Sequence, residues 1–258
     1  MSKVKQFFKK EWQSLRSTLS KVNPLVMTFF VVSVILMNVM ANKSIDLSWL
    51  PGNNTAEGEF GWLALDCGIL VSWLAFFSMD QIVRLHGPKA STQMTLVAIF
   101  VNLIACAVLL LAGTITGFWG ESYVEVGGEL INQALDNTIS GTWYVLMGST
   151  VAFISSAIVH GTISTGVSKL FKNKESLKTY AICSAFGTSL GQFVDNLIFA
   201  LIVSLNFFGW NILQCVMCSL TGMLVEFLLS VIFVPIGHKI YKRDLAKQKQ
   251  QELVSGEE

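Results

Sequence analysis

Residues 94–116 read MTLVAIFVNLIACAVLLLAGTIT, and this stretch decides the class of the protein. It contains no Asp, Glu, Lys or Arg, and it is long enough to cross a bilayer, which takes about 20 apolar residues. Lipid offers no hydrogen-bond partners, so the stretch is predicted to be a helix that satisfies its own backbone groups. The whole chain has the same character, with 52% hydrophobic and 14% charged residues and a mean hydropathy of +0.57. Soluble domains carry roughly 25% charged residues, so most of this chain is predicted to lie in a membrane.

Other apolar runs of spanning length flank this one on both sides. They cover residues 25–41, 62–79, 143–167, 181–208 and 212–236. Some are long enough to tilt or to contain a break. The sequence therefore predicts an all-α, polytopic integral membrane protein with six transmembrane helices.

The charged residues between the predicted spans alternate in sign. The loop after residue 116 contains Glu121, Glu125, Glu129 and Asp136 but no Lys or Arg. When alternate loops are assigned to opposite sides, Lys43 is the one basic residue of its side. All the others share one face: Lys3, Lys5, Lys9, Lys10, Arg16, Lys21, Arg84, Lys89, Lys169, Lys172, Lys174, Lys178, Lys239, Lys242, Arg243, Lys247 and Lys249. Basic loops face the cytoplasm, so both termini are predicted to be cytoplasmic.

The chain before the first span has one apolar stripe. Phe8, Trp12, Leu15, Leu19 and Val22 repeat at steps of four and three and are flanked by lysines. Residues 1–24 are therefore predicted to form an amphipathic helix on the anionic cytoplasmic leaflet, and a partner-protein helix is the alternative. Residues 25–238 form the predicted six-helix transporter domain, and residues 239–258 form a cytoplasmic polar tail.

Two carboxylates are the clearest cases of a charge near the middle of a predicted span, Asp195 in the fifth and Glu226 in the sixth. A charge at mid-membrane costs about 2.5–3.5 kcal/mol on insertion scales, so such residues face protein or water and usually serve function. Gln192 and Phe199 lie three before and four after Asp195, on the same helical face. This stripe could hydrogen-bond and stack a flat heterocycle. The alternative is that both carboxylates are protonated or paired and only hold helices together.

Other polar residues are less decisive. Asn38 and Asn42 are four apart on the first span and share a face. Asp66 and Asp80 lie near opposite ends of the second span, where water can reach them, so structural and functional roles are equally consistent with the pattern.

The fourth and fifth spans contain small polar positions. His160 lies four residues from both Ser156 and Ser164, and helix packing through hydroxyls is favoured there over a proton relay. Gly187 and Gly191 form a GxxxG that predicts a close helix contact.

The sequence contains no recognisable catalytic or metal-binding motif. Cys215 and Cys218 form a CxxC, but a structural metal would need two further soft ligands, and packing between helices is favoured. No disulfide framework is indicated, no nucleotide-binding loop is present, and the net charge of +1 argues against a nucleic-acid partner. The chain is predicted to be no enzyme, to need no cofactor or metal, and to be a transporter or a channel.

Four blocks together resemble the queuosine-precursor transporter family, also called the vitamin-uptake-transporter-like (VUT) family. The blocks are NVMANK at 38–43, DQIVRLHGPKA at 80–90, NQALDNTISG at 132–141 (a loop in the family), and Ser184, Gln192, Asp195 and Phe199 on the fifth span. The resemblance implies six helices and uptake of a 7-deazaguanine precursor of the tRNA nucleoside queuosine across a bacterial cytoplasmic (inner) membrane. Arg84 stands where the family usually has Glu, and His86 where it usually has Tyr, which leaves the ligand open.

The predicted substrate-binding residues combine the intramembrane polar groups with the family blocks. They are Asp195, Gln192, Phe199, Glu226, Asn38, Asn42 and Asp80. The expected partners are a small-molecule base and the lipid bilayer, and a homo-oligomer or energy-coupling subunits remain open. Two other functions also remain open: the substrate-binding subunit of an energy-coupling-factor transporter, which would need separate ATPase and scaffold proteins, and a membrane assembly factor without transport.

Overall fold

The computed structural model describes residues 3–53, 61–117, 128–140, 143–172 and 175–255. Within these ranges the chain forms helices joined by turns, and an isolated bridge between Ser44 and Asp66 is the only β-type pairing. The helices are α1 (Lys3–Lys21), α2 (Pro24–Met40), α3 (Ile69–Thr114), α4 (Gly128–Ser140), α5 (Trp143–Lys169), α6 (Leu177–Phe199), the π-helical η2 (Ala200–Ser204), α7 (Leu205–Phe207) and α8 (Ile212–Ser255). The predicted all-α class is confirmed.

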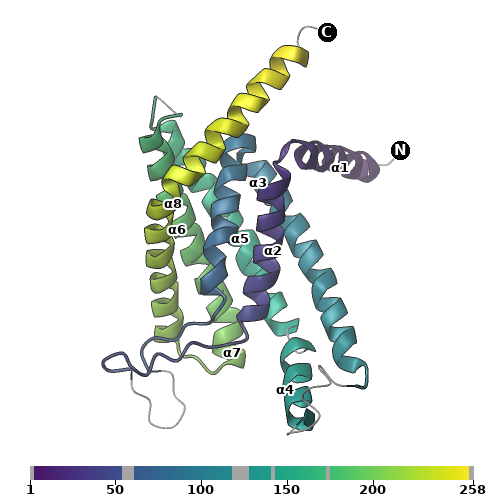
Figure 1. The fold of residues 1–258 in the computed structure, drawn as a ribbon, viewed down its shortest axis with the longest axis vertical. Coiled ribbons are helices and arrows are strands. Elements are labelled where there is room, and N and C mark those ends of the chain that lie inside the picture. Colours follow the sequence, from purple (N-terminus) through teal and green to yellow (C-terminus); the bar gives the residue numbers. More distant parts are fainter. Residues whose placement is uncertain (1–2, 54–60, 118–127, 141–142, 173–174, 256–258) are drawn as a thin grey trace.

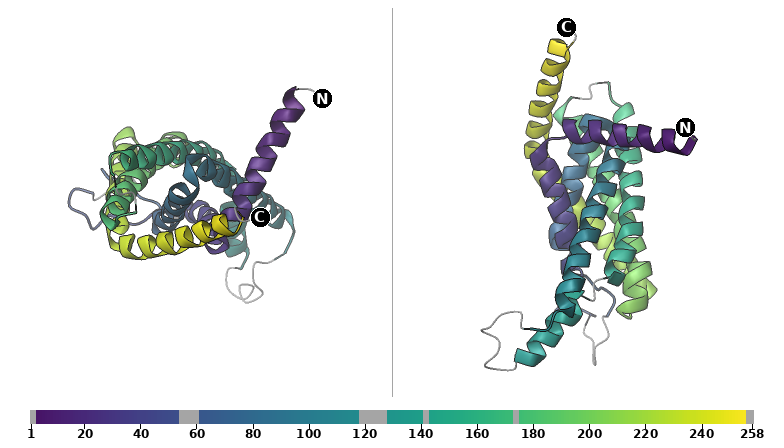
Figure 2. Two further views of the ribbon diagram at one scale, coloured as in Figure 1. Left: turned by 90° about the horizontal axis from the view of Figure 1, so that it is seen from above. Right: turned by 90° about the vertical axis from the view of Figure 1, so that its right-hand side faces the viewer.

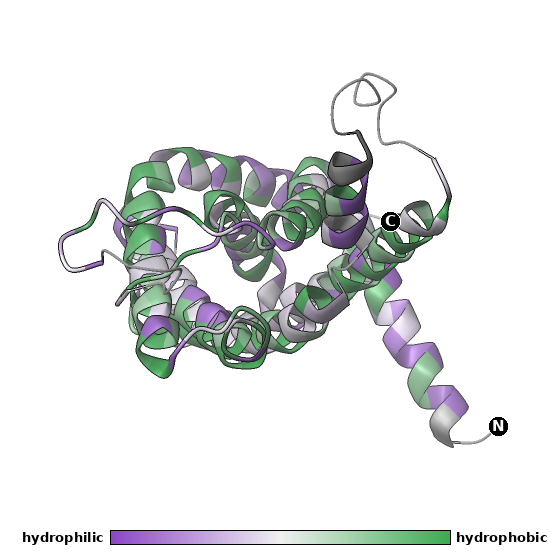
Figure 3. Ribbon diagram, turned by 90° about the horizontal axis from the view of Figure 1, so that it is seen from below, coloured by the Kyte–Doolittle hydropathy of each residue, from purple (hydrophilic) through white to green (hydrophobic). Residues whose placement is uncertain are grey.

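The long helices pack side by side in a bundle, and the two termini lie at the same end of it (Figure 1). The most extensive contacts join α5 to α6, α6 to α8, and α2 to α3. Phe30, Phe76 and Phe153, from α2, α3 and α5, lie fully buried in the centre of the largest apolar cluster. Figure 3 shows mainly hydrophobic ribbon over the bundle and alternating character along α1.

Helix α1 turns away from α2 by 110° and projects to one side of the bundle (Figure 2). Val22 is buried in the core and Leu19 packs against it, whereas Phe8 and Trp12 are exposed. Thr18 Oγ1 also donates to Gln93 Oε1 of α3 at 2.6 Å. The predicted apolar stripe of α1 therefore has two parts. Its last turn packs against the bundle and anchors the helix, whereas the apolar side chains of its first turns are exposed.

Two of the predicted spans are arms of the single helix α3. Gly87 interrupts it with φ 83° and ψ 173°, and Pro88 follows. The left-handed φ is a conformation that glycine adopts readily, and proline lacks the N–H that a continuous helix would use. The second arm therefore begins at this break, before the predicted start at residue 94.

The first arm of α3 begins later than predicted, at Ile69 rather than residue 62. The preceding residues are held in a non-helical path. Asn53 Oδ1 accepts from Leu63 N at 2.9 Å and Asn53 Nδ2 donates to Leu63 O at 3.1 Å, and Asp66 pairs with Ser44. Contacts with residues distant in sequence thus override the apolar character of this stretch.

Residues 132–140, which resemble a family loop, are helical and belong to α4. Ile131, Leu135 and Ile139 recur at steps of four, which is a helical spacing. This periodicity explains why the stretch folds as a helix, so the loop prediction is wrong there.

The predicted polar tail is the continuation of α8, which runs unbroken to Ser255. Tyr241 and Asp244 are buried, and Asp244 Oδ2 accepts from Asn23 Nδ2 at 2.8 Å. Lys249 Nζ lies 2.7 Å from Glu175 Oε1, and this ammonium lowers the pKa of Glu175 by hydrogen bonding and charge. The tail is thus tied to the bundle along its first turns.

Four helical segments are long and apolar enough to cross a membrane, and a fifth is added when the bent pair of α1 and α2 is counted. This confirms several membrane spans, with α3 counted once in spite of its break. The loop residues Glu121, Glu125 and Lys174, which the sidedness argument used, lie outside the described residues.

Candidate functional site

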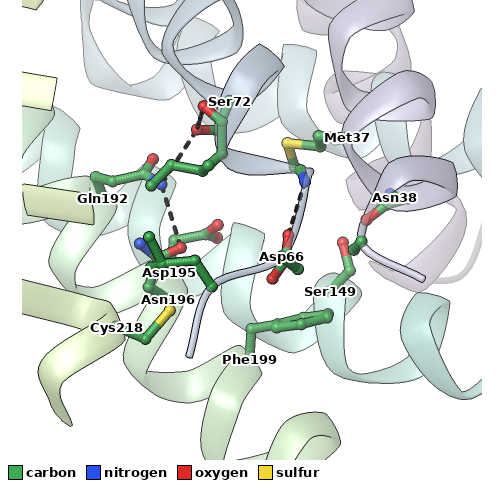
Figure 4. Close-up of a pocket in the computed structure, with 14 residues that line it drawn as sticks. Met37, Asn38, Asp66, Ser72, Ser149, Gln192, Asp195, Asn196, Phe199 and Cys218 are labelled. Carbon is green, nitrogen blue, oxygen red and sulfur yellow. Dashed lines mark hydrogen bonds between the residues drawn. The ribbon is translucent and has the colours of Figure 1, made fainter. Parts of the chain in front are cut away.

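A polar cavity of about 460 Å³, including the space at its mouth, lies in the half of the bundle away from both termini (Figures 1 and 4). It is formed where α2 ends, α3 and α8 begin, and α6 approaches η2. Its lining residues are Met37, Asn38, Ala41, Leu65, Asp66, Gly68, Ile69, Ser72, Ser149, Gln192, Asp195, Asn196, Phe199 and Cys218. The structure thus brings four predicted site residues together: Asp195, Gln192, Phe199 and Asn38.

Asp195 is buried, and one of its two carboxylate oxygens accepts a hydrogen bond from a neighbouring helix. Ser156 Oγ of α5 donates to Asp195 Oδ1 at 3.1 Å. In the described part of the chain no hydrogen bond is made to Oδ2, so this oxygen is available to a ligand. A buried carboxylate accepts hydrogen bonds only, so the group that it selects for is a donor.

Gln192 lies one turn before Asp195 on α6. Its Nε2 donates to Ser72 Oγ at 3.3 Å and to Asn196 Oδ1 at 3.2 Å. Its Oε1 is buried and has no partner among the described residues. Buried polar atoms in native proteins are normally hydrogen-bonded, so this acceptor is suited to a donor group of a ligand.

The two predicted asparagines of α2 have different surroundings. Asn38 lines the cavity, and its buried Nδ2 finds no acceptor within the described ranges. Asn42 lies outside the lining set. Its Nδ2 donates to Val39 O at 3.1 Å, and its Oδ1 accepts from Tyr144 OH at 3.1 Å. Asn38 therefore offers a free donor to the cavity, whereas Asn42 links α2 to α5.

Asp66 is the cavity residue that the sequence left undecided. It precedes α3 on the non-helical segment, and its Oδ1 accepts from Gly68 N at 2.7 Å. It faces the same space as Asp195 in Figure 4, and the two carboxylates interact electrostatically. The available signal was a second acidic residue inside an apolar run, but its position depends on how the loop folds.

The aromatic and apolar part of the lining includes Phe199, Met37 and Cys218. Phe199 is the last residue of α6, and the chain then passes into the π-helical η2. Single π-helical turns are rare and occur often at functional sites. The sequence predicted Phe199 through its spacing from Asp195 but gave no indication of the π-helical turn.

Glu226 lies apart from this cavity. It is buried on α8 beside a smaller space of about 200 Å³ that is shared with Trp73, Phe77, Ser184, Thr188, Leu229, Ser230 and Phe233. The hydroxyls of Thr188 and Ser230 lie 2.6 Å apart there and link α6 to α8. The structure therefore does not bring Glu226 to the cavity residues, and the predicted site residue that it interacts with is Asp80.

Asp80 also lies apart from the cavity, fully buried on α3. Its Oδ2 accepts from Arg84 Nε at 2.8 Å, and Arg84 Nη2 donates to Tyr180 O at 2.9 Å. The Arg84 guanidinium stands 4.2 Å from the centre of the Tyr180 ring. This buried ion pair lies toward the end of the bundle that holds the termini. The sequence analysis noted Arg84 as a basic residue of the cytoplasmic face and as a departure from the family, but did not predict its pairing with Asp80.

The predicted close contact at the GxxxG is confirmed. A Cβ added at Gly187 would lie 3.1 Å from Ser164 Cβ, and one at Gly191 would lie 3.1 Å from His160 Cβ. Because both glycines face α5, α6 approaches it closely beside the stripe that carries Asp195.

Gly222 of α8 provides a testable contact with the cavity wall. A Cβ at this position would overlap Asn196 Nδ2, whose amide oxygen accepts from Gln192. We expect Gly222→Ala to displace Asn196 and to destabilise the protein by about 1 kcal/mol, the low end of the usual cost of overpacking, because the atom that the new Cβ meets is the end of a flexible side chain. Thermal unfolding of the purified variant measures this.

Gly166→Ala is the matched control, because a Cβ there meets nothing within 4 Å. Adding Asn196→Ala to Gly222→Ala should recover the lost stability, since it removes the overlapping amide. Equal melting temperatures for Gly222→Ala and the unmodified protein would contradict the contact.

The cysteine pair shows no metal site. Cys215 and Cys218 are both buried and free, and Cys218 contributes to the cavity wall. In the described ranges no three His, Cys, Asp or Glu side chains are grouped as metal ligands.

Comparison with known proteins bears on the function. No curated protein and no solved structure matches the chain. Residues 66–239 match the model of the family described as "Putative vitamin uptake transporter". This range covers more than half of the sequence and includes α3, α5, α6 and most of α8, which carry most of the cavity lining. The chain therefore belongs to the vitamin uptake transporter family, a family of multi-pass membrane transporters.

Proposed function

We propose that this chain is a carrier that imports a 7-deazaguanine-type base across the cytoplasmic membrane of a bacterium, without enzymatic activity. The observation that carries the proposal is the group of unused polar atoms in one cavity. Asp195 Oδ2 and Gln192 Oε1 are acceptors and Asn38 Nδ2 is a donor, and none has a partner among the described residues.

The proposed ligand matches this arrangement in hydrogen bonding. A guanine-type base presents adjacent N–H donors on one edge, which a carboxylate and a neighbouring amide oxygen can accept. It also carries a carbonyl acceptor, which suits a free amide donor such as Asn38 Nδ2. Asp195 and Gln192 are one helical turn apart on the same face of α6.

The composition of the cavity lining also suits a bicyclic base. Ligand pockets combine an apolar lining with a few placed polar groups. Here the Phe199 ring lies in the wall together with Asp195 and Gln192. A flat heterocycle can stack on such a ring while its edge is hydrogen-bonded.

The proposal includes six membrane spans with both termini in the cytoplasm. The break at Gly87 makes each arm of α3 a separate segment, 69–86 and 88–114, and Figure 1 shows them as two arms. At 1.5 Å per residue the arms measure about 27 Å and about 40 Å, and a membrane-spanning helix takes about 17–25 residues, so both arms reach spanning length. Lys89, just after the break, pairs with Glu11 of α1 at 3.1 Å, which supports placing this turn on the side of the amino terminus.

Reporter fusions test this topology. We expect an alkaline phosphatase fused after Lys89 or Lys178 to be inactive, because these positions are cytoplasmic in the six-span arrangement. Fusions after Asp46 or Asn137 should be active on the outside. Activity after Lys89 would mean that the two arms of α3 do not form a hairpin of spans.

Direct binding tests the proposed ligand. The purified protein should bind labelled 7-deazaguanine, and 7-deazahypoxanthine, which lacks the exocyclic amine, should compete at least about tenfold less well. Leaving buried acceptors unpaired costs about 1–3 kcal/mol, and 1.4 kcal/mol is tenfold. Equal competition by both bases would overturn the proposed role of Asp195.

Proteoliposomes that contain only this chain test the transport step. Exchange of external labelled base for internal unlabelled base is expected without any other protein. If binding is present but exchange requires an added ATPase and scaffold, the chain is a substrate-binding subunit of an energy-coupling-factor transporter instead.

A further inference from the structure

We propose that His160 and Asp80 form a proton-binding site, separate from the substrate cavity, through which proton entry drives uptake. This inference rests on the proposed carrier function and names its energy source. Both ring nitrogens of His160 are buried without a partner in the described part of the chain, and so is Asp80 Oδ1. His160 Nε2 and Asp80 Oδ1 face each other at 3.8 Å.

The surroundings of His160 hold it in this place. Gly187 and Gly191 of α6 leave room for its ring and Cβ, and Phe76 of α3 meets the ring edge-on at 6.3 Å between centroids. A buried imidazole without hydrogen bonds is unfavourable, and packing alone does not require a histidine here. The unsatisfied pair therefore indicates a function.

The charged groups around this pair come from each neighbouring helix. Asp80 and Arg84 of α3 act on His160 directly, with opposite signs. From α6, Tyr180 and Cys183 interact with both Arg84 and Asp80, and from α8, Glu226 interacts with Asp80. Asp80 is thus a carboxylate placed between two basic side chains, Arg84 and His160.

Asp80 can pair with either Arg84 or His160, and this gives the site two states. In the present structure Oδ2 is bonded to Arg84 at 2.8 Å while Oδ1 is unused. A proton on His160 would give Oδ1 a charged donor. Any movement that takes Arg84 away from Asp80 then favours protonation of His160, because an unpaired buried charge is costly. Proton binding and the position of Arg84 are therefore linked.

The site is also connected to the substrate cavity through α5. Ser156, which donates to Asp195, lies one turn before His160 on the same face. On α3, Ser72 binds Gln192 and Asp80 lies two turns further along. A shift of α5 against α6 would act on both sites, which is what coupling between proton and substrate requires.

Accumulation driven by a pH gradient tests the inference. Proteoliposomes with a clamped membrane potential receive labelled 7-deazaguanine outside and a gradient of about one pH unit, acidic outside. One pH unit corresponds to about 1.36 kcal/mol, so coupling to one proton should give about tenfold accumulation of the base. His160→Gln should lower this ratio to about one while measurable exchange of internal for external base continues.

His238→Gln is the matched control, because this histidine contacts Glu175 O at 2.9 Å near the start of α6. It should keep the tenfold accumulation. Arg84→Gln is a second variant. Without the Arg84 guanidinium, Asp80 pairs with protonated His160 in both states of the site, so accumulation should fall while exchange remains measurable. Tenfold accumulation by His160→Gln would overturn the inference.

The unmodified protein separates this inference from the proposed function. Binding and exchange of 7-deazaguanine with no accumulation under the gradient would overturn the proton site alone. A lack of both binding and exchange would overturn the carrier proposal itself.

Discussion

Asp195→Asn is expected to weaken binding of 7-deazaguanine by roughly tenfold to a hundredfold without unfolding the protein. The substitution replaces the free Oδ2 acceptor with an NH₂ donor that would meet the donors of the base. Such a loss costs about 1–3 kcal/mol, at 1.4 kcal/mol per tenfold. The remaining amide oxygen can still accept from Ser156 Oγ, so the contact between α5 and α6 should survive. Equilibrium binding and melting temperature, measured on the same purified variant, test both statements.

Asp46→Asn is the control for loss of a carboxylate, because Asp46 is exposed in the loop after α2 and, among the described residues, accepts only from Ser48. Its affinity for the base should equal that of the unmodified protein. Gln192→Ala should cause a smaller loss than Asp195→Asn, since a neutral acceptor makes the weaker bond. If Asp195 served only to hold the helices together, Asp195→Asn would lower the melting temperature and leave affinity intact.

Much of the helical architecture could be predicted from hydrophobicity and charge alone. The predicted spans at 25–41 and 143–167 agree closely with α2 and α5, because their ends coincide with changes in apolar character. The start of α3 could not be predicted in this way. Residues 62–68 are apolar enough to be the first turns of a helix. They follow a non-helical path because the side-chain amide of Asn53 makes two hydrogen bonds to the backbone of Leu63, ten residues later.

The candidate site was predictable where its residues share one helix. Gln192, Asp195 and Phe199 lie on one face because of helical periodicity, and the structure places all three around the cavity. Asp80 and Glu226 were grouped with them only because they are charged or belong to a family block. Asp80 lies eight residues beyond Ser72, and Glu226 eight beyond Cys218, which is roughly 12 Å along a helix at 1.5 Å per residue. The sequence alone does not show which residues of neighbouring helices lie at the same level, so it could not exclude Asp80 and Glu226 from the site.

The position of Asp66 has consequences for substrate selection. It brings a second carboxylate to the cavity from a non-helical segment, opposite the α6 stripe (Figure 4). One carboxylate is enough to accept the donors of a guanine-type edge. A second one favours a ligand with an additional donor or a positive charge elsewhere, because Gly68 N supplies a donor to only one of the two Asp66 oxygens among the described residues.

Asp66→Asn is therefore expected to discriminate between two bases. Binding of 7-aminomethyl-7-deazaguanine, which carries an ammonium group at neutral pH, should fall about tenfold to a hundredfold. Hydrogen bonds to charged groups are worth about 1.5–3 kcal/mol, at 1.4 kcal/mol per tenfold. Binding of uncharged 7-deazaguanine should change much less. The measurement is the ratio of the two dissociation constants, before and after the substitution.

Asp195→Asn is the matched comparison, since it should weaken both bases by similar factors and leave their ratio unchanged. The two substitutions thus separate recognition of the shared edge from recognition of the charged substituent. Asp66→Asn keeps an oxygen that can accept from Gly68 N, so the turn before α3 should persist. An equal loss for both bases would show that Asp66 acts on the shared edge or on the loop fold. Unchanged binding of both bases would assign the Asp66 carboxylate to the turn that it forms with Gly68 N and leave Asp195 as the carboxylate that recognises the base.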